Sequence, residues 1–326
     1  MTSGHRYLQV SLGDSISPPS TDQHLLVAFR FAADANNTSH PAVVDIALEP
    51  LESNEIYECW WVAEPVSYRR NGSIRIAECS DYAVLVQEID EGPGDDLTSL
   101  TQNAYRETFQ TLRSTDHSRM AKVWNYLGAI NSGDGDNERY RQFSVGRASA
   151  FSEYALPDDA SPAGTGIGTR LQRGLTIITL ASRHPLLLAE NPRQVSAFQY
   201  PRQYGPSSPK FARGAAVLTG SHALHLLSGT ASIVGHESLH PLDVEAQLEE
   251  TLRNIAALGG SLSVLDGDSV HRVYMREMGD TDAIATELQE RLAVRRDQIV
   301  FLRGDICRRE LLIEIDGVRV QETSRT

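Results

Sequence analysis

Lysine is almost missing from this chain: of its 30 basic residues only Lys122 and Lys210 are lysines, and all others are arginines. Codon bias accounts for such a pattern, but arginine is also the better bidentate partner of a carboxylate. The 43 acidic residues leave a net charge of −13. Nucleic-acid binding needs a basic face, so we expect no nucleic-acid partner for this acidic chain. Its arginines indicate instead a small anionic ligand.

Long apolar runs are missing too, so the sequence predicts no membrane-spanning segment. The first residues, Met1–Arg6, show no secretory pattern. Cys59, Cys79 and Cys307 are too scattered for a disulfide framework or a CxxC metal site. We therefore expect a cytoplasmic protein with reduced thiols.

What the chain does have is a strand and helix pattern that occurs twice. After a strand-rich start, we expect helices over Leu97–Arg113 and Asn137–Ser152 in the first half. Strands are expected over Ala121–Ile130 and Leu175–Leu180, and a loop over Pro157–Gly168. In the second half we expect roughly the same order, with helices over Asp243–Leu258 and Asp280–Leu292. Strands are expected over Ser269–Met275, Gln298–Phe301 and Leu311–Ile315. An internal duplication indicates an α/β (α+β) fold, with mixed sheets and helices packed on one face.

The closing strand carries a carboxylate among aliphatic residues. Alternation puts Leu311, Ile313 and Ile315 on one face and Leu312, Glu314 and Asp316 on the other. A shielded Glu314 would have a raised pKa and could act as an acid near neutral pH. The alternative is an edge strand whose Glu314 points into water.

Several segments resemble RidA/YjgF-like proteins. They are Leu227–Ser232, Asp243–Gln247, Thr251–Ile255 and the closing strand, and the first half carries its own version from Trp124 to Gly168. The resemblance implies two fused RidA/YjgF-like (chorismate-mutase-like) domains, over residues 1–183 and 184–326, the second of which carries the acid.

A narrower resemblance covers nearly the whole chain. The blocks Glu138–Arg147, Pro162–Gly168, Phe198–Pro209, Gly235–Ser238 and Arg303–Arg308 are similar to those of the chorismatases. In that family chorismate loses its enolpyruvyl group as pyruvate, with no metal or redox cofactor. The resemblance implies chorismate as the small-molecule substrate, no cofactor, and 3-hydroxybenzoate and pyruvate as products.

The same resemblance assigns catalytic residues. Glu314 matches the acid that protonates the enolpyruvyl methylene. Cys307, together with Gly at the position of Gly220, matches the branch that forms 3-hydroxybenzoate. Without the resemblance, Cys307 could equally be a small buried thiol and Gly220 a turn glycine.

Two carboxylates on the substrate call for cations and hydroxyl donors. The candidates for substrate binding are Arg147, Arg202, Arg139, Tyr140, Tyr200 and Tyr204. Each arginine could instead form a surface ion pair, and each tyrosine could be a core residue. His236 and His240 have HExxH spacing, but Gly235 and Pro241 around them argue against the helix that a metal site needs.

Two other functions stay open at this stage. One is the hydrolytic chorismatase branch, which gives a dihydroxycyclohexadiene carboxylate, or a mixed output of 3- and 4-hydroxybenzoate. The other is a non-catalytic, small-ligand-binding protein of RidA/YjgF type. For assembly we expect a monomer or a weak homo-oligomer.

Overall fold

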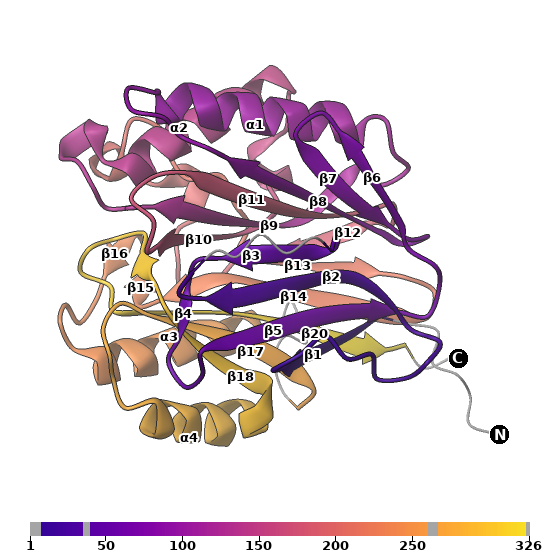
Figure 1. The fold of residues 1–326 in the computed structure, drawn as a ribbon. Coiled ribbons are helices and arrows are strands. Elements are labelled where there is room, and N and C mark those ends of the chain that lie inside the picture. Colours follow the sequence, from indigo (N-terminus) through magenta and orange to yellow (C-terminus); the bar gives the residue numbers. More distant parts are fainter. Residues whose placement is uncertain (1–7, 35–39, 260–266, 324–326) are drawn as a thin grey trace.

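A computed structural model describes residues 8–34, 40–259 and 267–323 of the chain; the segment Met1–Arg6, considered above, lies outside them. Within these ranges the chain forms two seven-stranded sheets, a four-stranded sheet and a two-stranded ribbon. The helices lie on the outer sides of the layers and the sheets lie between them (Figure 1). Among the described residues, no helix combines the length and the apolar character needed to cross a membrane.

The first large sheet uses mostly the N-terminal half. Its spatial order is β19 (Asp305–Ile306), β10 (Ala163–Thr169), β9 (Arg119–Gly128), β11 (Leu175–Ser182), β8 (Tyr82–Ile89), β7 (Ile74–Glu78) and β6 (Ser67–Asn71). Helices α1 (Leu97–Leu112) and α2 (Arg139–Glu153) cover its outer face, where Tyr105 and Phe143 join the core. Asp96 caps α1 by accepting from the backbone N–H groups of Thr98 and Ser99.

The second large sheet repeats this arrangement. Its order is β12 (Leu186–Ala189), β13 (Gly214–Leu218), β14 (His222–Ala231), β20 (Ile313–Glu322), β17 (Ser269–Met275), β18 (Ile299–Arg303) and β4 (Glu49–Pro50). Helices α3 (Val244–Leu258) and α4 (Thr281–Leu292) pack on its outer face. The pair β17 and β18 is parallel, as is the pair β9 and β10. The expected duplication and mixed sheets with helices on one face are therefore confirmed.

The smaller sheet extends the N-terminal part. It contains β1 (Gln9–Gly13), β5 (Glu55–Val62), β2 (His24–Ala32) and β3 (Val43–Ile46). Side chains from this sheet and from the inner faces of both large sheets share one core, which includes Phe29, Trp124 and Tyr274. The inner faces of the two large sheets thus meet through side chains of both halves.

The two halves also exchange edge strands. β11 ends at Ser182 in the first sheet and β12 begins at Leu186 in the second. However, β4 from the N-terminal part pairs with β18, and β19 from the C-terminal part pairs with β10. Division into domains of residues 1–183 and 184–326 therefore stays a prediction, since each large sheet contains a strand from the other half.

Two local predictions change in the structure. Pro157–Gly168 was expected as a loop, but its second part is β10, a buried parallel strand. The closing strand runs on to Glu322 and starts at Ile313, so Leu311 precedes it. The ribbon of β15 (Ile233–Val234) and β16 (Glu237–Ser238) places Glu237 in a strand, not in the helix that an HExxH site requires.

Candidate active site

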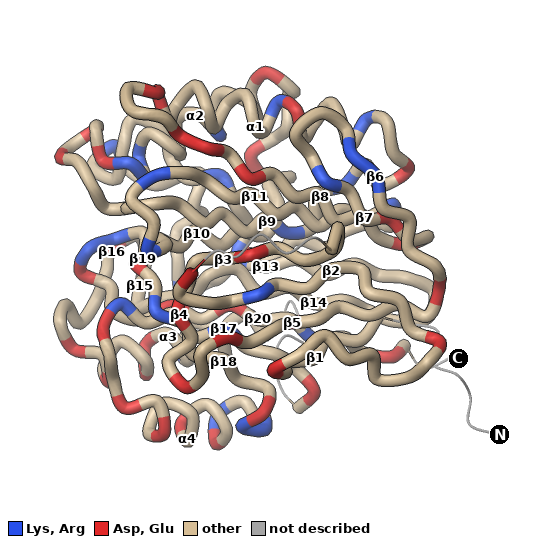
Figure 2. Tube along the Cα trace, viewed as in Figure 1, with Lys and Arg blue, Asp and Glu red and all other residues tan. Residues whose placement is uncertain are grey.

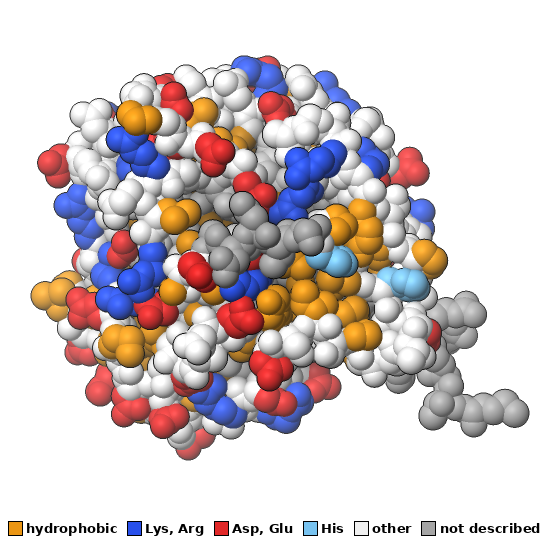
Figure 3. Space-filling view, viewed as in Figure 1, with side chains coloured by type: hydrophobic (Ala, Val, Ile, Leu, Met, Phe, Trp, Pro, Cys, Tyr) orange, Lys and Arg blue, Asp and Glu red, His pale blue; other side chains and the backbone are white. Residues whose placement is uncertain are grey.

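A cavity of about 520 Å³ lies where the two large sheets meet. Its wall is built from α2, β10, β14, the irregular segment from Tyr200 to Arg213, and the residues between β19 and β20. Acidic and basic side chains are interspersed on the face shown in Figure 3, whereas Figure 2 shows a basic stretch of chain beside β16 and β19. Arg308 and Arg309, which follow β19 in the chain, line the cavity.

Glu314 lies in the floor of this cavity. It sits on β20, a central strand, with Ala231 of β14 on one side and Tyr274 of β17 on the other. The residue is 4% exposed, so the alternative of an edge strand in water is wrong. Burial, and next the negative charge of Asp316, raise the pKa of Glu314 to about 8. The carboxyl group is therefore mainly protonated at neutral pH.

The strand alternates as expected around Glu314. Ile313 and Ile315 point outward into the core below α3 and α4, whereas Glu314 and Asp316 are on the inner face. Gly229 of β14 lies against the acid, because a methyl group there would lie 1.9 Å from Oε1 of Glu314. A β-bulge between Leu227 and Thr230 brings this part of β14 against β20. The site thus needs a residue without a side chain at position 229.

Among the residues that the structure describes, five arginines line the cavity, namely Arg141, Arg147, Arg213, Arg308 and Arg309. Arg147 and Arg213 are buried, and Arg308 lies with its guanidinium carbon 3.9 Å from the Tyr204 ring centroid. Arg213 donates from Nη2 to the Tyr200 hydroxyl at 2.7 Å. Within the described residues, Nε and Nη2 of Arg147, Nε of Arg213 and Nη2 of Arg308 have no hydrogen-bond partner. Buried donors are normally satisfied, so this set is suited to an anionic ligand.

Hydroxyl and thiol groups complete the wall. Tyr140, Tyr200 and Tyr204 all line the cavity, as predicted for substrate donors. Burial raises the pKa of the Tyr140 phenol above its ordinary value. Burial, and then the nearby Glu314, raise the pKa of the Cys307 thiol to about 12. Both groups are therefore neutral, and Cys307 is a weak hydrogen-bonding group here and not a thiolate.

Three predicted site residues lie elsewhere. Arg139 donates to both carboxylate oxygens of Glu91 at 2.6 Å and to the Gly128 carbonyl, so its guanidinium is committed to a structural ion pair. Arg202 is exposed and pairs with Asp136. Gly220 lies in the turn between β13 and β14, where an added methyl group would meet nothing within 4 Å. None of the three is a lining residue of the cavity.

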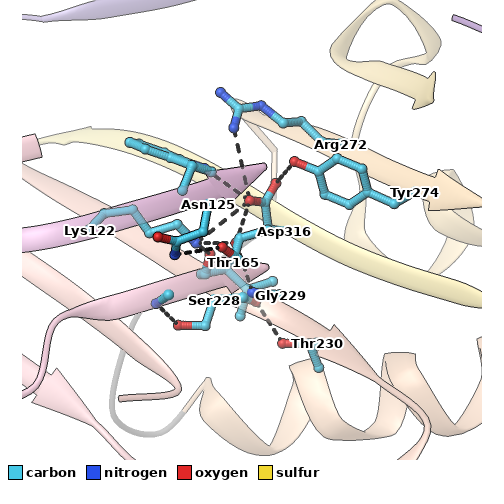
Figure 4. A network of polar contacts seen from close by, with 12 residues as sticks. Lys122, Asn125, Thr165, Ser228, Gly229, Thr230, Arg272, Tyr274 and Asp316 are labelled. Atoms are coloured by element: carbon cyan, nitrogen blue, oxygen red, sulfur yellow. Dashed lines mark hydrogen bonds and ion pairs between the residues drawn. The ribbon is translucent and has the colours of Figure 1, made fainter. Parts of the chain in front are cut away.

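Other residues of the site were missed from the sequence. Gly229 and Arg308 lie in the blocks Leu227–Ser232 and Arg303–Arg308 but were not identified as site residues, and Arg213 lies in none of the blocks. Lys122 and Thr165, beneath Glu314, are part of a buried polar network (Figure 4). Only the rarity of lysine could have drawn attention to Lys122.

Comparisons with known proteins bear on this site. Residues 58–181 match the family model described as "Chorismatase FkbO/Hyg5-like, N-terminal". The chain is 37% identical over 275 residues to the 3-hydroxybenzoate synthase of Streptomyces hygroscopicus, covering 79% of this chain and 80% of that protein. It is 32% identical to a chorismatase of the same organism, over 80% of this chain and 78% of the relative.

A solved structure agrees with these relatives. The crystal structure of a chorismatase superposes with a TM-score of 0.81 at 29% sequence identity, covering 96% of this chain and 97% of that one. The similarity therefore includes both halves of the chain.

Proposed function

Because the chain belongs to the chorismatase family, we propose that its cavity converts chorismate to 3-hydroxybenzoate and pyruvate. The chain is an enzyme of the chorismatase kind. The observation that carries the proposal is the buried carboxyl of Glu314 in a cavity lined by arginines, where burial raises the pKa of this carboxyl to about 8. The greater identity to the 3-hydroxybenzoate synthase supports the choice of product.

The first chemical step is proton transfer from Glu314 to the methylene carbon of the enolpyruvyl group. The carbon–carbon double bond supplies the electron pair, and an oxocarbenium ion forms at the ether carbon. An acid with a pKa of about 8 holds its proton at neutral pH and still gives it up to a reactive carbon. The protonation turns pyruvate into a leaving group.

The two substrate carboxylates are met by the cavity arginines. Arg147, Arg213 and Arg308 come from different segments and have donors free of partners within the described residues. Two carboxylates held by separate guanidinium groups fix the orientation of the ring, which lowers the barrier by making the reaction effectively intramolecular. The Tyr140 and Tyr204 hydroxyl groups are further donors in the same wall.

Aromatic product then forms within the substrate. The ring C4 hydroxyl oxygen bonds to C3 while the C3–O bond to the leaving group breaks, and the electron pair of the broken bond stays as a lone pair on the carbonyl oxygen of pyruvate. The C4 hydroxyl group gives up its proton as this bond forms, and the Glu314 carboxylate accepts it. The resulting arene-oxide-like ring opens at the C4–O bond, C3 loses its hydrogen as a proton, and the oxygen is protonated. Cys307, as a neutral thiol, is the candidate to assist this opening.

The remaining features of the proposal are coarser. Chorismate is the proposed small-molecule partner, and the proposed location is cytoplasmic. A monomer or weak homo-oligomer is proposed because both halves of the duplicated fold already meet within one chain.

The test is incubation of the purified protein with chorismate, with products separated by chromatography and pyruvate measured enzymatically. Equal amounts of 3-hydroxybenzoate and pyruvate are expected. A non-aromatic diene acid would show the hydrolytic branch instead, and absence of turnover would leave only ligand binding.

Glu314→Gln tests the proposed acid. We expect loss of pyruvate release with an unchanged circular dichroism spectrum, since the amide is isosteric but cannot donate the proton. Glu287→Gln is the matched control, because Glu287 lies on α4 in a surface ion pair with Arg291. Wild-type turnover by the Glu314 variant would remove Glu314 from the mechanism.

A further inference from the structure

Lys122 is a buried lysine in a chain that has only one other. It is on the inner face of β9 and is 1% exposed. Its Nζ donates to the Thr165 hydroxyl at 2.7 Å and to the Leu227 carbonyl at 2.6 Å, and lies 3.6 Å from Oδ2 of Asp316 (Figure 4). Because a buried ammonium is costly unless it is paired and hydrogen-bonded, this lysine is held at a defined place between the two sheets.

Thr165 of β10 uses its full hydrogen-bonding capacity in this network. Its hydroxyl accepts from Lys122 Nζ and from the Gly229 N–H at 3.1 Å, and it donates to Oδ2 of Asp316 at 2.7 Å. A hydroxyl has one donor and two acceptor sites, so its orientation is fixed. Thr165 therefore joins the lysine, Asp316 and the backbone of Gly229 in a single arrangement.

This network lies directly behind the catalytic acid. Gly229, whose N–H bonds to Thr165, is the residue against Oε1 of Glu314. Asp316 is two positions from Glu314 on the same inner face of β20, and it also accepts from Trp124 Nε1 at 3.0 Å. The charged and titratable groups that act on Glu314 most directly are Asp316, Lys122, Arg213, Tyr140 and Cys307. Around these, Arg147 and Arg308 lie in the same cavity wall, Arg272 Nη1 lies 3.9 Å from Oδ2 of Asp316, and the Tyr274 hydroxyl lies 3.5 Å from its Oδ1.

We propose that Lys122 is a positioning residue which, together with Thr165 and Asp316, sets how tightly Glu314 holds the proton that it delivers to substrate. The inference deepens the proposed function and rests on it for its catalytic meaning. The effect of these neighbouring charges on proton binding by Glu314 is a property of the substrate-free protein and is measurable without substrate.

Opposite electrostatic effects of the two partners support this role. The negative charge of Asp316 raises the pKa of Glu314, and the positive charge of Lys122 lowers it. Burial in turn lowers the pKa of Lys122 to about 8. Without Lys122, Glu314 would hold its proton too tightly. Without Asp316, the ammonium group of Lys122 would stabilise the deprotonated carboxylate of Glu314.

The direct test is a ¹³C NMR titration of protein labelled at the glutamate side-chain carboxyl, with Glu314→Gln used to assign the signal. We expect Lys122→Met to raise the Glu314 midpoint by about one unit and Asp316→Asn to lower it. Arg291→Met is the control, because it removes a cation from a surface ion pair on α4 and leaves the Glu314 midpoint unchanged. The alkaline limb of the kcat/KM profile for chorismate should move in the same directions.

A purely structural role for Lys122 predicts a different result, namely lower stability and rate with an unmoved midpoint. If Lys122→Met does not fold, the double variant Lys122→Met/Asp316→Asn removes both charges of the pair, and its midpoint should lie above that of Asp316→Asn alone. Equal midpoints in wild type and in the variants that fold would overturn the inference. Absence of turnover in every protein, with midpoints that do shift, would instead refute the proposed function alone.

Discussion

Replacement of Gly229 by alanine is the most direct mechanical test of the acid's position. The new methyl carbon would lie 1.9 Å from Oε1 and 2.8 Å from Cδ of Glu314. Ordinary contact begins at 3.4 Å, so the carboxyl oxygen must move by about 1.5 Å. The moving atoms are the end of a side chain, so we expect the variant to fold.

The expected loss follows from that displacement. A misplacement of about 1 Å in a reacting group costs roughly 100-fold in rate, which corresponds to about 2.7 kcal/mol of transition-state stabilisation. We therefore expect kcat/KM for pyruvate release to fall at least about 100-fold in Gly229→Ala. Gly13→Ala is the matched control, because its new methyl group would meet nothing closer than 3.6 Å. A kcat/KM within about threefold of wild type would refute the view that Glu314 acts from its place against Gly229.

Two further predictions concern the stability cost of the acid and the choice of product. Since the folded pKa of Glu314 is raised from 4.5 to about 8, the folded state binds this proton more tightly than the unfolded state, and stability from this group falls as pH rises between those values. Urea unfolding should show Glu314→Gln more stable than wild type by the order of 3 kcal/mol at pH 7, and a gap that does not widen from pH 5 to pH 8 would contradict the burial argument. In Gly220→Ala/Cys307→Ala, chromatography should show a shift from 3-hydroxybenzoate toward the diene acid, and the single variants tell which residue is responsible. Of these two residues only Cys307 lines the cavity. An effect of Gly220→Ala alone on the product would therefore have to be transmitted through β14.

Much of the fold was predictable because its elements carry strong local patterns. The helix expected over Asp243–Leu258 matches α3, and the alternation around Glu314 matches the structure as well. The region of β10 was misread as a loop because its glycines look like turn residues. In the structure these glycines make room for neighbours, since a methyl group at Gly164 would lie 2.8 Å from Cβ of Phe211. Such close approach depends on tertiary packing, which a single sequence does not display.

The site was predictable in part, for a similar reason. The Tyr200–Tyr204 block was distinctive, and its tyrosines do line the cavity. The arginines could not be ranked, because an arginine's role depends on which acid reaches it. Arg139 meets Glu91, which is 48 positions away in the chain, whereas Arg213 reaches the cavity with a donor left over. Neither fact follows from local pattern or spacing.

The duplicated fold places the acid on β20 of one sheet, and the equivalent strand of the other sheet has no counterpart. β11 and β20 occupy equivalent places in the two sheets, yet β11 (Leu175–Ser182) has no acidic residue. The inner face of the first sheet instead supplies donors to Asp316, from Trp124 and Thr165, with the ammonium of Lys122 alongside. A second buried acid on β11 would need its own cation and donors from the other sheet. The inner face of that sheet carries carboxylates at Glu314 and Asp316, and its buried guanidinium, Arg272, is already paired with Glu58. Complementary charge across the contact between the halves therefore favours a single active centre over two symmetric ones.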